Sequence, residues 1–111
     1  MIIFYRTRKL EKICNKKDAM KKSLGEKMSK KLQQRLAELK AANTLADISY
    51  LPPVRLHELI GTRQGQFSVD LEHPFRLLFI VANQESNYLE SGSINRQQVT
   101  EIEIIAITDT H

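Results

Sequence analysis

The hydrophobic pattern of the chain changes near its middle, and this change restricts the possible folds more than any other feature. Between residues 8 and 42, apolar residues recur mainly at the spacing of amphipathic helices. After residue 54 they fall in short runs of strand type, separated by Gly, Pro and Asn. A chain of 111 residues has room for one hydrophobic core. We therefore expect a single α+β domain that spans residues 1–111.

The first half is expected to form a strand, two helices and a short helical turn. The main helix is indicated by an apolar stripe at helical spacing, with Arg35 and the lysines mostly elsewhere on the wheel. The polar stretch 16–24 is expected to be a loop or a short continuation of the first helix. The first predicted elements are a strand at 1–5 and a helix that is capped by Thr7 and ends near Asn15. They are followed by a helix at 26–42 and a turn at 45–48 that is capped by Thr44. The apolar stripe of the helix at 26–42 consists of Met28, Leu32, Leu36 and Leu39.

The second half is expected to form a sheet. Residues 75–82 are almost continuously apolar, which is typical of a central strand covered on both faces. Residues 66–71 alternate, so Phe67, Val69 and Leu71 should share one dry face. The predicted strands are 55–60, 66–71, 75–82 and 99–109, and the polar stretch 83–98 is expected to be a connecting loop.

Charge is distributed unequally along the chain. Residues 1–40 hold 13 Lys and Arg against 4 Asp and Glu, whereas residues 41–111 hold 4 against 9. Such a basic half favours a partner rich in phosphates or an acidic protein, although each single lysine fits a solvated helix face equally well.

Several classes of protein do not fit the sequence. No apolar run approaches the roughly 18 residues of a membrane span. At the N-terminus the apolar residues precede the positively charged ones, which is the reverse of the order in a secretory signal. We therefore expect a cytoplasmic protein. The single cysteine, Cys14, is expected to be a buried apolar residue, and neither a metal constellation nor a phosphate loop is present, so no cofactor is expected.

Two histidines are the best candidates for chemistry. His57 lies in a predicted strand, and His111 ends another, where a two-residue period would place it on one face with Asp109. Imidazole suits proton transfer near neutral pH, and cleavage of RNA through its 2′-hydroxyl needs two such transfers. The alternatives are a structural strand histidine and an ordinary surface tail.

Two arginines are suited to stabilise negative charge on phosphate oxygens. Arg63 lies in a turn flanked by glycines, and Arg76 lies at the head of the central strand. The alternatives are a solvated turn for Arg63 and a salt bridge to Asp70 or Glu72 for Arg76.

Taken with the order of the predicted elements, three segments of the sheet half resemble the HigB branch of the RelE toxin superfamily. They are Leu56-His57-Glu58-Leu59-Ile60-Gly61, Gln66-Phe67-Ser68-Val69-Asp70-Leu71 and His73-Pro74-Phe75-Arg76-Leu77-Leu78-Phe79. The resemblance implies an N-terminal strand and two helices packed on a small twisted antiparallel sheet. It also implies a toxin of a type II toxin-antitoxin system, which cleaves mRNA on the ribosome without a metal ion.

The resemblance extends to particular residues. The family's histidine matches His57, its strand-opening arginine matches Arg76, and its C-terminal Asp-Tyr-His matches Asp109, Thr110 and His111. Thr110 departs from the family pattern, because the family usually has tyrosine there. The missing ring is expected to weaken activity, to shift codon preference, or to be replaced by another aromatic residue such as Tyr88.

The resemblance also implies partners. The helix at 26–42 would dock on ribosomal RNA, and a helix-turn-helix antitoxin of the HigA type would hold the toxin inactive in a hetero-oligomer. The residues expected to contact RNA are Lys27, Lys30, Lys31, Arg35 and Arg63.

Two other functions use the same scaffold. One is a non-enzymatic gyrase inhibitor of the ParE type, which would not need the histidines. The other is a degenerate toxin that only binds an antitoxin, for which Thr110 is the hint. Some relatives carry a killer suppression label, but the pattern of this chain is that of the toxin.

Overall fold

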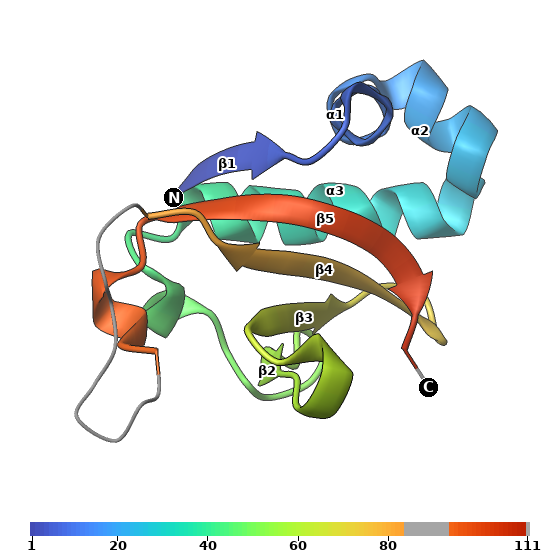
Figure 1. Ribbon diagram of the computed structural model, residues 1–111. Coiled ribbons are helices and arrows are strands. Elements are labelled where there is room, and N and C mark those ends of the chain that lie inside the picture. The colour runs from blue at the N-terminus through green and yellow to red at the C-terminus, as the bar shows by residue number, and fades with distance from the viewer. Residues whose placement is uncertain (84–93, 111) are drawn as a thin grey trace.

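The computed structural model, which describes residues 1–83 and 94–110, confirms the α+β class (Figure 1). Helices precede most of the sheet, as the sequence predicts. The helices are α1 (Arg8–Asn15), α2 (Lys17–Leu24) and α3 (Glu26–Ala41). The strands are β1 (Ile2–Tyr5), β2 (His57–Glu58), β3 (Gln66–Asp70), β4 (Phe75–Val81) and β5 (Glu101–Asp109). Single 3-10 turns span Leu45–Asp47, Gly61–Arg63 and Arg96–Gln98.

The five strands form one mixed sheet in the order β1-β5-β4-β3-β2. The prediction of an antiparallel sheet is wrong for one pair, because β1 runs parallel to β5 and places Ile3 beside Ile102. The three helices between β1 and the rest of the sheet allow the chain to return in the parallel direction. β4 lies at the centre of the sheet, as its continuous apolar run predicts.

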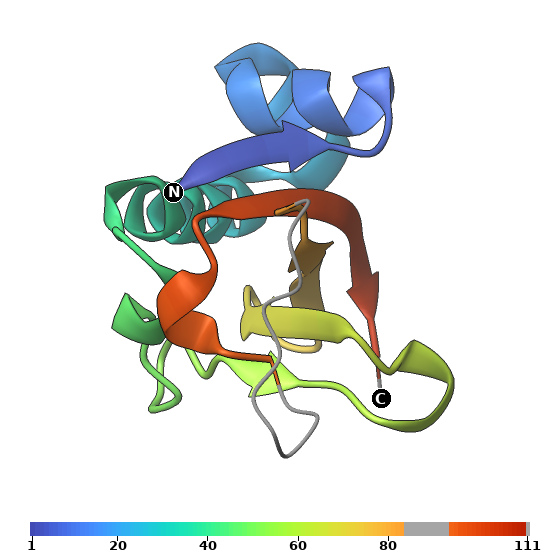
Figure 2. The same ribbon diagram turned by 60° about the vertical axis from the view of Figure 1, so that its left-hand side comes forward.

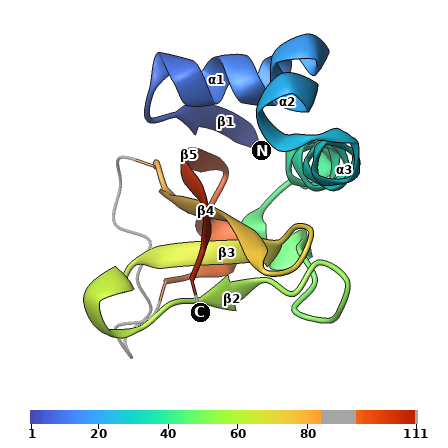
Figure 3. The same ribbon diagram turned by 90° about the vertical axis from the view of Figure 1, so that its right-hand side faces the viewer.

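The core lies between α3 and one face of the sheet. The predicted apolar stripe of α3 is buried, and its Leu32 and Leu39 pack in one cluster with Phe67 and Phe79 of the sheet. The two phenylalanine rings stack with their centroids 5.8 Å apart. Figure 3 views α3 end-on beside the strands, with α1 and α2 gathered near β1. No α-helix in residues 1–83 and 94–110 covers the opposite face of the sheet, which is called the helix-free face below.

The stretch 16–24 is a separate helix, so the prediction of two helices is corrected to three. Lys16 is extended and separates α1 from α2, while Met20 of α2 is only 2% exposed. One buried methionine anchors a helix whose other side chains are mostly polar, which explains why its periodicity is weak. Gly25 has a φ of 82° and links α2 to α3, a conformation that favours glycine.

The strand predicted at 55–60 is shorter than expected. Arg55 has a φ of 52°, in the left-handed region that extended strands do not use. Beyond Glu58 the pairing continues only through the amide of Leu59, which donates to the carbonyl of Gln66 at 2.8 Å, before the chain enters the turn Gly61–Arg63. His57 is thus held in a two-residue strand at the edge of the sheet.

β5 bends across the sheet. Ala106 pairs with Leu78 but Ile104 pairs with Phe79, so Ile105 is an extra residue at a β-bulge. Beyond this point the strand curves, and its C-terminal end comes down toward β2 and β3 (Figures 1 and 2). The C-terminal end of β5 thereby approaches the helix-free face.

Candidate functional site

The helix-free face of the sheet carries a row of polar side chains. Alternation along β3 places Phe67 in the core and Ser68 and Asp70 on the opposite face. The strand register pairs Ser68 with His57 on β2, and Asp70 with Arg76 on β4. Residues far apart in the sequence therefore meet on one surface.

A small pocket of about 180 Å³ opens on this face. Its lining comes from β2, β3, β4 and the segment that precedes β2. The described residues that line it are Tyr50, Arg55, Leu56, His57, Asp70 and Arg76. Two of the four predicted catalytic residues, His57 and Arg76, therefore share one pocket.

The charges of the pocket centre on Asp70. One carboxylate oxygen lies 3.4 Å from Nε of Arg76, and the other lies 3.6 Å from Nη1 of Arg55. The alternative expectation that Arg76 pairs with Asp70 or Glu72 is thus confirmed for Asp70. Because two guanidinium groups share one carboxylate, the described side chains that line the pocket carry a net positive charge. The side chain of Arg55 is 54% exposed, so this cation is accessible to an anionic ligand.

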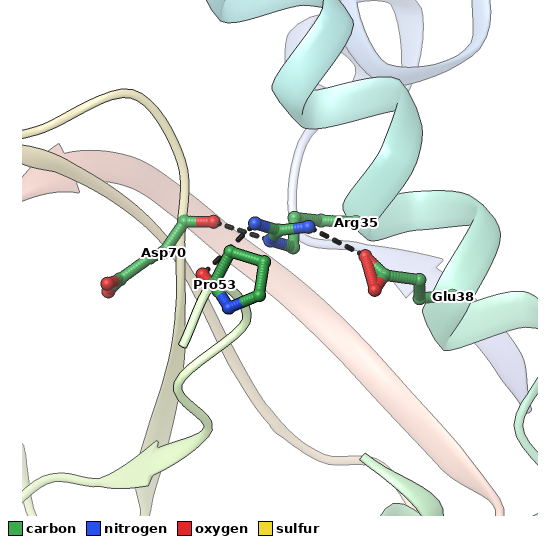
Figure 4. Close-up of polar contacts among 4 residues, drawn as sticks. All are labelled: Arg35, Glu38, Pro53 and Asp70. Atoms are coloured by element: carbon green, nitrogen blue, oxygen red, sulfur yellow. Dashed lines mark hydrogen bonds and ion pairs between the residues drawn. The ribbon is translucent and has the colours of Figure 1, made fainter. Parts of the chain in front are cut away.

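The prediction that Arg35 contacts RNA is wrong, because its side chain is buried. Only 1% of Arg35 is exposed, and its guanidinium is directed toward the protein interior (Figure 4). Nε donates to the carbonyl of Asp70 at 2.7 Å, Nη2 to the carbonyl of Pro53 at 3.0 Å, and Nη1 to Oε1 of Glu38 at 2.7 Å. Arg35 therefore joins α3 to the end of β3 and to the segment before β2.

The same segment is tied to β3 a second time. The amide of Asp70 donates to the carbonyl of Val54 at 2.8 Å, so both backbone groups of Asp70 are engaged. The amide of Leu56 donates to the carbonyl of Ser49 at 2.9 Å and closes the segment into a loop. These bonds fix the backbone on which three pocket residues lie.

The lysines predicted to bind RNA lie elsewhere. Lys27 and Lys30 are exposed on α3 and Lys31 is half-buried. Since α3 covers the face of the sheet opposite the pocket, these lysines and the pocket form two separate basic surfaces. The lysines of α3 and the residues of the pocket therefore do not belong to one site.

The remaining predicted residues surround the pocket or fall outside the described chain. Arg63 is exposed in the turn after β2 and is not among the described residues that line the pocket. Asp109 ends β5 opposite Phe75, while Thr108 lies opposite Arg76. His111, and with it the terminal histidine of the prediction, lies outside the described residues, as does Tyr88.

Four residues that line the pocket were not predicted as site residues, namely Tyr50, Arg55, Leu56 and Asp70. Tyr50 does not belong to any periodic pattern of apolar residues in the sequence. Arg55 lies at the start of the predicted strand 55–60, where it resembles an ordinary strand residue. The left-handed backbone of Arg55 is unusual for a residue other than glycine, and such conformations concentrate at functional sites. No local pattern in the sequence indicates that backbone.

A second basic feature is a broad groove of about 630 Å³ between α1 and α2. Ile13 and Ala19 are half-buried in it, and five lysines border it. The residues that line the groove are Lys9, Lys12, Ile13, Lys16, Lys17, Asp18, Ala19, Lys22 and Ser23.

Residues 1–83 and 94–110 lack the features of a metal site and of a membrane-spanning helix. In these ranges, no group of three His, Cys, Asp or Glu residues is placed to hold a metal ion. No helix there has the length and the apolar character to cross a bilayer.

Burial raises the pKa of the Cys14 thiol to about 11, although Lys40 acts in the opposite direction.

The pocket combines an imidazole, two guanidinium groups, a carboxylate and a phenol. Imidazole can accept or donate a proton near neutral pH, and guanidinium can hold phosphate oxygens. The arrangement therefore suits a phosphate-containing ligand.

Among known proteins, the chain matches no family model and no curated sequence. The resemblance to the HigB branch stays a prediction.

Proposed function

We propose that this chain is a RelE-like toxin of a type II toxin-antitoxin system, an endoribonuclease that inhibits translation by cleaving mRNA on the ribosome. The observation that carries the proposal is the meeting of His57, Arg55 and Arg76 in one pocket on the helix-free face of the sheet. The α+β architecture and the C-terminal strand that approaches this face also support it.

In the proposed reaction, the 2′-oxygen of a ribose attacks the adjacent phosphorus and the bond from phosphorus to the 5′-oxygen breaks. His57 serves as one of the two proton-transfer groups, and the resemblance assigns the other role to His111. Arg76 and Arg55 stabilise the negative charge on the phosphorane oxygens. Asp109 orients a histidine or contacts the RNA, and no metal ion takes part.

Binding to the ribosome is assigned to the lysines of α3. Lys27, Lys30 and Lys31 would contact ribosomal RNA, while Arg63 lies in the turn after β2 and would contact the mRNA strand. A HigA-like helix-turn-helix antitoxin would hold the toxin inactive in a cytoplasmic hetero-oligomer. A small adjacent reading frame of this type would support the assignment.

The test is a reconstituted translation reaction in which mRNA cuts are mapped. The wild-type protein is expected to cut mRNA only when ribosomes are present. His57→Ala should reduce the rate by about 100-fold or more because one proton-transfer group is lost. His111→Ala should have a comparable effect, and circular dichroism should show that both variants are folded.

A matched control is His73→Gln, which changes a histidine that is not among the described residues lining the pocket. It should cut mRNA at nearly the wild-type rate. Full cutting by both His57→Ala and His111→Ala would exclude the catalytic assignment. Growth arrest with gyrase inhibition and no cuts would identify the ParE-type alternative, and tight antitoxin binding without growth arrest would identify the degenerate toxin.

A further inference from the structure

An exposed aromatic ring borders the arginine pocket. Tyr50 lines the pocket beside Arg55 and His57, yet the residue is 73% exposed. Its neighbour Leu51 is also 55% exposed but is not among the described residues that line the pocket. A large exposed ring beside a cationic pocket suggests a role in binding rather than in packing.

The backbone that carries this ring is held in place before any ligand binds. The amide of Leu51 donates to Oγ of Ser49 at 3.0 Å, and the amide of Arg55 donates to the carbonyl of Leu51 at 3.0 Å. Arg35 anchors the same loop through the carbonyl of Pro53. A ring on such a loop loses little conformational entropy when a ligand covers it.

We propose that Tyr50 and the adjacent pocket form a nucleobase subsite, in which a base stacks on the tyrosine ring and its phosphate lies against Arg55 and Arg76. The inference rests on the proposed function in taking RNA as the ligand, and it adds a residue that recognises the base. A nucleotide offers a flat aromatic face next to a negative charge, which matches the two surfaces that meet here.

An apolar protein segment matches these surfaces less well. Covering Tyr50 with such a segment would bring apolar groups over the neighbouring guanidinium of Arg55 and remove its water. A nucleotide phosphate instead supplies a charge-assisted hydrogen bond at that position. The charge next to the ring therefore favours a nucleotide.

The subsite should detect the presence of a base more than its identity. Every base has a π-face, so stacking on Tyr50 tolerates all four. The phenol oxygen is not needed for stacking, and Tyr50→Phe should bind as the wild type does. The ring, and not the hydroxyl group, is the recognition element.

The experiment compares RNA binding with and without a base at the cleavage position. The probes are an uncleavable RNA oligonucleotide with a 2′-O-methyl group at the mapped cut, the same RNA with one abasic position, 5′-adenosine monophosphate and inorganic phosphate. Tyr50→Ala should lose on the order of tenfold in affinity for the intact RNA and for the mononucleotide. Its affinities for the abasic RNA and for inorganic phosphate should equal those of the wild type.

Leu51→Ala is the matched control, because it removes a neighbouring exposed apolar side chain. It should leave all four affinities unchanged. Equal binding of intact RNA by the wild type and Tyr50→Ala would overturn the subsite, as would an equal loss in Leu51→Ala. An equal loss of affinity for inorganic phosphate in Tyr50→Ala would also overturn it, since stacking would not explain that loss.

Failure of the proposed function has a different signature. If the wild type cuts no mRNA but Tyr50→Ala still loses affinity for the base, the subsite stands without the nuclease. If the wild type cuts mRNA and Tyr50→Ala binds and cuts equally well, the nuclease stands without the subsite.

Discussion

The two halves of this protein differ in their cations, because the helical half holds every lysine and three of the seven arginines, whereas the sheet half holds arginines alone. All ten lysines lie between Lys9 and Lys40, whereas residues 41–111 contain four arginines and no lysine. Arginines form the ion pairs Arg6–Glu103, Arg35–Glu38, Arg55–Asp70, Arg76–Asp70 and Arg96–Glu58. Arg96 also lies over the ring of Phe67, with its guanidinium carbon 5.4 Å from the ring centroid. The two cations therefore have different structural roles.

The difference follows from the chemistry of the two side chains. Guanidinium is planar, weakly hydrated and able to donate in several directions, so Arg35 can be buried with three hydrogen-bond partners. An ammonium group is strongly hydrated and remains at the surface, where it contributes to a positive field. A buried arginine such as Arg35 holds particular carbonyl and carboxylate groups in place, whereas the exposed lysines supply positive charge at the surface.

The largest expected effect on stability comes from Arg35. Arg35→Met keeps an unbranched apolar side chain in place of the aliphatic part of arginine but removes the donors to Asp70, Pro53 and Glu38, so the free energy of unfolding should fall by about 3 kcal/mol. Urea denaturation measures this change. Lys30→Met, on the exposed side of the same helix, should change it by less than about 0.5 kcal/mol. Equal effects would remove the distinction between the two cations.

The second effect concerns the buried thiol of Cys14 in the helical half. Cys14 has a pKa of about 11 because burial outweighs the charge of Lys40. Since burial raises the pKa of Cys14 in the folded state, the contribution of this thiol to the free energy of unfolding should be fully present below about pH 9. It should be lost, by about 2 to 3 kcal/mol in total, as the pH rises through about 11.

Denaturation at a series of pH values measures this decline in the wild type and in Cys14→Ala. The variant should lose less stability above pH 9. Burial also raises the pKa of Tyr5, so Tyr5→Phe is measured beside it to separate the two contributions. An identical alkaline profile in the wild type and Cys14→Ala would contradict the assignment.

The third effect concerns binding rather than folding. Replacing Lys27 and Lys30 by alanine should reduce ribosome affinity by about tenfold and lower the salt dependence by about two counterions. Stability should stay within about 0.5 kcal/mol, because both side chains are exposed. The matched variant replaces Lys12 and Lys16 in the α1/α2 groove. If both pairs reduce affinity equally, net charge and not a particular surface governs docking.

The smallest effect separates two buried serines. Ser29 is buried in the helical half and its hydroxyl donates to the carbonyl of Gly25 at 2.6 Å. Ser68 is buried in the sheet half and its hydroxyl has no hydrogen-bond partner among the described residues. Ser29→Ala should lower the free energy of unfolding by about 1 kcal/mol, whereas Ser68→Ala should leave it unchanged or raise it slightly. A loss in Ser68→Ala equal to that in Ser29→Ala would show that the hydroxyl of Ser68 is paired.

The sequence alone was enough to predict features that depend on neighbours along the chain. The stripe of α3 is buried as its spacing predicts, and the turn after Thr44 forms with the amide of Thr44 donating to Oδ2 of Asp47 at 3.2 Å. The alternation of β3 also placed Phe67 in the core correctly. Short-range periodicity and capping determine such features, and both are visible in the letters of the sequence.

Only the tertiary structure decided how distant residues meet. The spacing of α3 puts Arg35 between Leu32 and Leu39 on the buried side, but its carbonyl partners come from other elements. The parallel pairing of β1 with β5 is likewise a contact between the two ends of the chain. The pocket joins Tyr50 to Arg76 across three elements, and its geometry depends on sheet register and on one left-handed residue. These contacts join residues that are far apart in the sequence, and no local pattern in the sequence predicts them.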